Sequence, residues 1–116
     1  MPDEPGGGDA GDRRVLLIMI ISSPNALDDV LTAMLDYGVA GTVVEAKGLM
    51  ALMREEMPVF GGLASMLGST TGSKVILSLT TAKLVEQIFG FIDSEMKAKE
   101  RPLAFTVPVD SVRAAS

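Results

Sequence analysis

Residues 15–38, VLLIMIISSPNALDDVLTAMLDYG, decide the fold, because they join an apolar strand to an amphipathic helix. The segment from Val15 to Ser22 is short and rich in Ile and Val, which favours a β-strand. Its apolar residues occupy both parities: one holds Val15, Leu17, Met19 and Ile21, and the other holds Leu16, Ile18 and Ile20. Since successive side chains of a strand point to opposite faces of a sheet, we expect both faces of this strand to be covered.

A helix is predicted directly after that strand. Ser23 suits the N-cap, and Pro24 suits the first helical position, where a missing N–H costs nothing. Gly38 suits a left-handed turn that ends the helix. The apolar positions between these signals recur at helical spacing and predict one buried stripe, made of Leu27, Val30, Leu31, Met34 and Leu35.

The second half of the chain repeats this alternation of strands and a helix. Val39 to Lys47 is predicted to be a second strand, which Gly48 breaks. Lys74 to Thr80 is predicted to be a third strand, apolar at nearly every position, and Thr81 caps a second helix. The buried stripe of that helix is predicted to be Val85, Ile88, Phe89, Ile92 and Met96.

A fourth strand, Leu103 to Val109, completes the pattern, and Pro108 assigns it to a sheet edge because proline cannot donate to a ladder. The order βαββαβ predicts an α+β, ferredoxin-like domain: a four-stranded antiparallel sheet with both helices on one face and the first and third strands in the centre. We assign this domain to residues 14–113. Residues 1–13 are rich in Gly, Pro and Asp and are expected to be a disordered tail.

The two-sided apolar character of the central strands predicts an assembly. Two helices can cover only one face of the sheet, so a monomer would expose a contiguous aliphatic surface, which soluble monomers avoid. We therefore expect this face to be buried against other copies of the chain in a cyclic oligomer.

Composition excludes several classes of function. With 15 acidic and 10 basic residues the net charge is −5, so nucleic acid is not an expected partner. The chain has no Cys and no His, which removes thiolate nucleophiles, the commonest general base and the commonest metal ligands. The longest apolar run, Val15 to Ile21, is too short to span a membrane, and we expect a cytoplasmic protein. We expect no enzymatic activity and no metal site.

The connection between the second and third strands, residues 49–73, is long and unusually apolar. Connections of this length in a small domain are more often functional than structural. Its residues could pack on the domain or on a neighbouring subunit, or they could form a Met-rich docking element for a target protein. For docking we single out Arg54, Val59, Phe60, Leu63 and Met66.

Three motifs resemble the small PII-like proteins related to the nitrogen regulatory protein PII. They are YGVAGTVVEAKG at residues 37–48, PVFGGLASMLG at 58–68 and LAFTVPVDSV at 103–112, and they occur in the family's order. The resemblance covers residues 15–113. It implies the ferredoxin-like fold, a homotrimer with inward-facing sheets, and a T-loop at 49–73 that docks onto a target enzyme or membrane transporter.

The resemblance also implies an effector site between subunits, with an adenine nucleotide as the candidate effector. The corresponding residues here are Lys47, Gly48, Lys97, Lys99, Arg101 and Arg113. The sequence departs from the family at this site. The family's Arg-Gly-Phe-Gly-Arg stretch is KGLMA at residues 47–51, and the turn before the last strand, KAKERP, has no glycine. The basic residues of the turn could instead be an ordinary helix end, and the tyrosine modified in PII is absent.

Two functions therefore stay open. The first is a PII-like regulatory trimer that binds a small effector and controls a target through its long loop. The second is a structural or interaction trimer that has lost effector binding.

Overall fold

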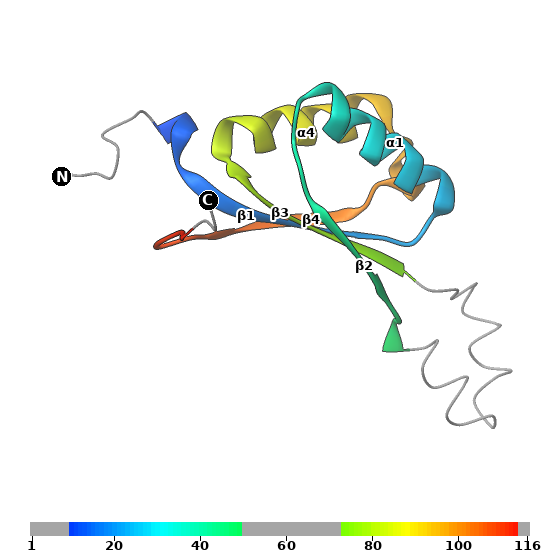
Figure 1. Cartoon of the computed structure of the whole chain (residues 1–116). Coiled ribbons are helices and arrows are strands. Elements are labelled where there is room, and N and C mark those ends of the chain that lie inside the picture. The colour runs from blue at the N-terminus through cyan, green and yellow to red at the C-terminus, as the bar shows by residue number, and fades with distance from the viewer. Residues whose placement is uncertain (1–9, 50–72, 114–116) are drawn as a thin grey trace, which may run out of the picture.

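The computed structural model describes residues 10–49 and 73–113, which form a four-stranded antiparallel sheet and two α-helices. The elements follow in the order η2 (Ala10–Asp12), β1 (Arg14–Ile21), α1 (Pro24–Asp36), β2 (Thr42–Ala46), β3 (Ser73–Thr81), α4 (Ala82–Glu95), η4 (Ala98–Glu100) and β4 (Leu103–Pro108). Both helices lie on the same side of the sheet (Figure 1). This confirms the predicted α+β, ferredoxin-like arrangement. Most of the long connection and most of the expected tail lie outside the described residues.

The strand order β2-β3-β1-β4 puts the two most apolar strands in the centre. β1 pairs in antiparallel fashion with β3 on one side and with β4 on the other, and β2 pairs with the outer side of β3. Pro108 lies at the end of the edge strand β4, opposite Val15, as its missing N–H predicts. At the start of the chain, η2 lies within the range expected to be a tail.

The helix boundaries follow the predicted capping residues. The Ser23 hydroxyl accepts a hydrogen bond from the Ala26 amide at 3.4 Å, and the Thr81 hydroxyl accepts one from the Leu84 amide at 3.3 Å. Each cap satisfies an amide that has no partner within its helix. Gly38, with φ of 71°, forms the left-handed turn after α1, which residues with a Cβ rarely adopt.

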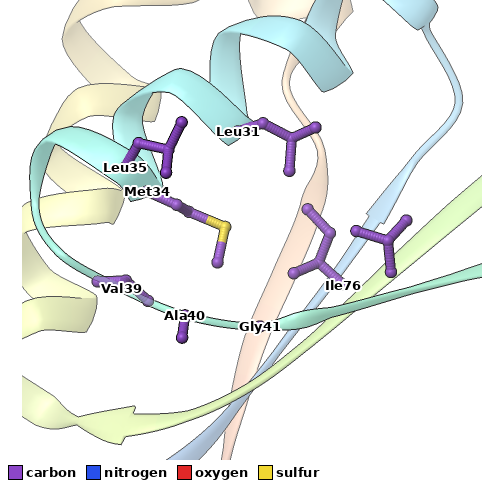
Figure 2. Close-up of a pocket in the computed structure, with 8 residues that line it drawn as sticks. Leu31, Met34, Leu35, Val39, Ala40, Gly41 and Ile76 are labelled. Carbon is purple, nitrogen blue, oxygen red and sulfur yellow. The ribbon is translucent and has the colours of Figure 1, made fainter.

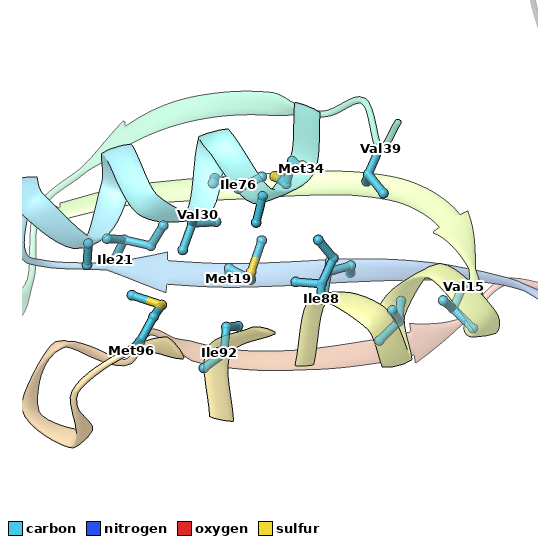
Figure 3. Close-up of a cluster of buried hydrophobic side chains, with 14 residues drawn as sticks. Val15, Met19, Ile21, Val30, Met34, Val39, Ile76, Ile88, Ile92 and Met96 are labelled. Atoms are coloured by element: carbon cyan, nitrogen blue, oxygen red, sulfur yellow. The ribbon is translucent and has the colours of Figure 1, made fainter. Parts of the chain in front are cut away.

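The hydrophobic core fills the space between the helices and one face of the sheet (Figure 3). β1 contributes to the core the alternate side chains that include Leu17 and Met19, both of which have no exposed surface. The other buried apolar residues are Val15, Ile21, Ala26, Val30, Ala33, Met34, Val39, Ile76, Val85, Ile88, Ile92 and Met96. The predicted stripe of α4 is confirmed, with Phe89 packed partly buried at its margin.

The predicted stripe of α1 is partly wrong. Val30 and Met34 are buried, but Leu35 is 80% exposed, and the small residues Ala26 and Ala33 take part in the core instead. Small side chains let a helix approach the sheet closely, so the face that carries them turns inward. This rotation moves Leu35 away from the core and toward solvent.

β2 begins three residues later than predicted. The chain first crosses from α1 to the sheet through Val39, Ala40 and Gly41, where the buried Ser78 hydroxyl donates a hydrogen bond to the Ala40 carbonyl. A Cβ at Gly41 would lie 3.1 Å from the Leu77 carbonyl oxygen, a tight contact, so glycine lets the backbone pass this close to β3 without displacing its neighbours.

Candidate functional site

The face of the sheet that the helices leave uncovered carries rows of apolar side chains. We call it the open face. Paired residues share a face in an antiparallel sheet, so the register defines three rows across β3, β1 and β4. These rows are Leu79–Leu16–Val107, Leu77–Ile18–Phe105 and Val75–Ile20–Leu103. β2 extends the last two rows with Thr42 and Val44.

The open face is accessible in the single chain. Leu103 is 64% exposed and Phe105 is 41% exposed. The exposed fractions of Leu79 and Val44 are close to that of Phe105. Ile18, in the middle row, is half-buried because its neighbours on both sides crowd it. Soluble proteins rarely leave a contiguous apolar surface of this kind open to water.

Charge is almost absent from the open face. Among the described strand residues that share its parity, only Arg14 is charged, and it lies at one end of β1 opposite Thr81. An uncharged, aliphatic centre is typical of the core of a protein–protein interface. The prediction that the central strands are apolar on both faces is thus confirmed, and the structure adds the contribution of β4. That contribution could have been found in the sequence from the alternation of Leu103, Phe105 and Val107.

The residues predicted to bind an effector do not converge within one chain. Lys47 and Gly48 follow β2 at one edge of the sheet, and Arg101 precedes β4 at the opposite edge. Both positions lie at the same end of the sheet, because Ala46 is paired with Ser73 and Leu103 with Ile20. Two strands nevertheless separate them.

Arg113 lies at the other end of the sheet from Lys47. It follows the end of β4, where Pro108 is paired with Val15. Lys97 and Lys99 are exposed around η4, on the connection from α4 to β4. A site built from all six predicted residues would therefore need a second copy of the chain to bring them together.

Arg101 has partners within its own subunit. Its guanidinium donates hydrogen bonds to the Asp93 carbonyl oxygen at 2.8 Å and to the Met96 carbonyl oxygen at 3.2 Å. Both acceptors belong to the end of α4, where the helix dipole is negative, so the side chain stabilises the helix end. This geometry matches the ordinary helix-end role that the sequence left open for this residue.

The predicted docking residues Arg54, Val59, Phe60, Leu63 and Met66 lie outside the described residues. In the part of the chain that the structure describes, no group of three or more acidic side chains is placed to hold a metal ion. No helix within residues 10–49 and 73–113 is both long and apolar enough to cross a membrane.

No protein-family model matches the chain, and no curated protein matches it with a significant score.

Proposed function

We propose that this chain is the subunit of a cytoplasmic, PII-like homotrimer that regulates a target protein. In this proposal the open faces of three copies turn inward around the threefold axis, and residues 49–73 engage the target. The observation that carries the proposal is the open face: a nearly uncharged, aliphatic sheet surface that no described element covers. Burying such a surface between copies would stabilise the assembly by about 25 cal/mol for each Å² of apolar surface removed from water.

The regulatory part of the proposal rests on the sequence resemblance to PII-like proteins and on the position of the long segment between β2 and β3. A small effector, with an adenine nucleotide as the candidate, would bind in clefts between subunits. Lys47 and Gly48 of one copy would meet basic residues of a neighbouring copy. Arg113 is one of these candidates, and within a single chain it lies at the opposite end of the sheet from Lys47. An intersubunit site would agree with the separation of these residues in a single chain.

Isothermal titration calorimetry tests effector binding. Wild-type protein is titrated with ATP, ADP, cyclic nucleotides and bicarbonate, and a Lys47→Ala variant serves as the site variant. A matched control, Lys83→Ala, removes a lysine from the exposed surface of α4. Binding of one ligand that Lys47→Ala weakens and Lys83→Ala leaves unchanged would support the sensor. Absence of heat with every ligand would contradict it.

A trimer without a sensor is the second candidate function. It is favoured by the engagement of Arg101 with the carbonyls of α4 and by the loss of glycines in the KGLMA and KAKERP segments. The two candidates share the assembly and differ in the titration.

The target-binding role of the loop has its own test. Replacing residues 50–70 by a short Gly-Ser link should preserve the folded trimer, since the free energy of closing a loop changes by only about 0.6 kcal/mol per doubling of its length. The same deletion should abolish capture of the target, and Phe60→Ala and Leu63→Ala should weaken it more than they lower the melting temperature. Unfolding on deletion would instead mean that this segment is part of the core.

A further inference from the structure

Arg14 is the charged residue of the open face among the described strand residues. It begins β1, which is a central strand, and it shares its parity with Leu16, Ile18 and Ile20. Its side chain is exposed, and within the described part of the chain it makes no ion pair and no side-chain hydrogen bond. The charge therefore lies at one end of an aliphatic surface without a partner in its own subunit.

The surroundings of Arg14 add positive charge and do not compensate it. Arg14 is paired with Thr81, the N-cap of α4, so the positive end of this 14-residue helix lies at the same end of the sheet. Arg13 precedes it in the chain, and Lys83 lies in the first turn of α4. Asp12 is close in sequence, but in the described structure it makes no ion pair with Arg14.

The two hollows of the described structure offer an anion less. The larger one, between the end of α1 and the start of β2, has a volume of about 380 Å³ and is lined by apolar residues and Gly41 (Figure 2). The smaller one contains Arg101, but Asp93 lines it as well, and the Arg101 guanidinium already donates to the α4 carbonyls. Arg14 differs from these groups because it lies on the surface that the proposed assembly buries.

Threefold symmetry would bring three copies of Arg14 to one level of the assembly. A rotation leaves the height of an atom along its axis unchanged, so equivalent residues form a ring. The open faces turn inward in the proposed trimer, and sheets that pack face to face lie about 10 Å apart, so long side chains pointing inward from three sheets come together. Three guanidinium groups in such a ring repel one another, and shielding from water makes an opposite charge between them more stabilising.

We infer that the trimer binds a phosphate group on its axis, between the three Arg14 side chains. The inference rests on the proposed homotrimer and adds to it an anion site separate from the effector clefts. Guanidinium groups donate pairs of hydrogen bonds to phosphate oxygens. A tetrahedral oxyanion has a threefold axis of its own, so one anion can make the same contact with each subunit. Because this ligand binds the trimer and not the separated subunit, it stabilises the trimer by mass action.

The stoichiometry of binding tests this inference, because a trimer has one axis and three clefts. Isothermal titration calorimetry is performed in Tris chloride at constant ionic strength, with inorganic phosphate and separately with ATP, to distinguish a free anion from the phosphate of a nucleotide. Arg14→Gln removes the charge. Arg13→Gln is the matched control, because it removes the neighbouring exposed charge, which lies just outside β1. Light scattering gives the mass of every sample, and circular dichroism checks the fold.

Phosphate should bind the wild type at about one group per three chains, as one site on the axis requires. Arg14→Gln should weaken this binding at least about tenfold, and Arg13→Gln should leave it unchanged. In phosphate-free buffer Arg14→Gln should melt at a higher temperature than the wild type, because it removes repulsion within the ring. The same stoichiometry and dependence on Arg14 with ATP alone would support the site and assign its phosphate group to a nucleotide.

Several results would overturn the inference and leave the proposed trimer standing. They are one anion per chain, equal effects of the two variants on binding, and a trimer that binds neither phosphate nor ATP. A trimer that Arg14→Gln destabilises in phosphate-free buffer would also overturn it, because Arg14 would then be paired with an acidic residue of a neighbouring copy. A monomeric wild-type protein would overturn the proposed trimer together with the inference.

Discussion

Replacing Ile18 with aspartate is expected to separate the subunits. Ile18 lies at the centre of the open face, between Leu77 on β3 and Phe105 on β4, and is half-buried in the single chain. In one subunit the carboxylate would keep partial contact with water. In the assembly it would be fully buried and without a partner, and such a charge costs about 3–5 kcal/mol.

The size of this cost indicates that the substitution weakens association and leaves the subunit folded. A loss of 3–5 kcal/mol weakens association by roughly a hundredfold to several thousandfold, because each 1.4 kcal/mol is a factor of ten. The stability of a typical domain is about 5–15 kcal/mol, so the separated subunit should keep its fold. Sedimentation velocity over a range of protein concentrations measures the association, and circular dichroism checks the fold.

Two further variants make this prediction decisive. Ile18→Val removes one methyl group, which costs about 0.5–1.5 kcal/mol, and should keep the assembly. The double variant Leu103→Asp and Phe105→Asp changes residues that are 64% and 41% exposed in the single chain, so it should dissociate the protein without unfolding it. If Ile18→Asp and the double variant both sediment like the wild type, the open face is not an interface.

Four smaller effects follow from local geometry. Ser23→Ala should destabilise the protein by about 0.5–2 kcal/mol through loss of the α1 N-cap, seen as a lower midpoint in urea; an unchanged midpoint would show that the cap contributes nothing. Gly90→Ala should stabilise α4 by up to about 1 kcal/mol, because a Cβ there meets nothing within 4 Å. Gly41→Ala should lower the melting temperature, and equal effects of the two alanines would refute the close approach at Gly41. Arg101→Ala should cost about 1 kcal/mol of unfolding free energy through lost bonds to the end of α4, whereas Arg101→Lys should recover only part of it.

Features set by local sequence could be predicted reliably. The caps at Ser23 and Thr81 and the turn at Gly38 depend only on adjacent backbone groups, and the structure has all three. The order of elements followed from periodicity, and the two crossovers then left one plausible sheet topology. The apolar character of both faces of β1 was visible in its unbroken apolar run.

Features set by packing between elements could not be predicted in the same way. The spacing of Leu35 fits the apolar stripe of α1, but whether it is buried depends on which side of a wide stripe meets the sheet. Ala26 and Ala33 decide this, and small residues give little signal in a hydrophobic pattern.

The predicted effector residues show a different limit. Basic residues near Lys97 and Arg101 fit either a cleft or a helix end by sequence alone. The hydrogen bonds of Arg101 to the α4 carbonyls depend on how the chain turns after the helix, and no spacing rule gives that turn. Whether Lys47 and Arg113 meet would depend on contacts between copies in the proposed assembly, which the sequence of one chain does not contain.

The mass of the wild-type protein in solution tests the central claim most directly. Size-exclusion chromatography with light scattering at micromolar concentration should give about 36.6 kDa, the mass of three copies of the 12.2 kDa chain. A monodisperse species of 12.2 kDa would show that the open face is stable in water and would contradict the assembly from which the proposed function is built.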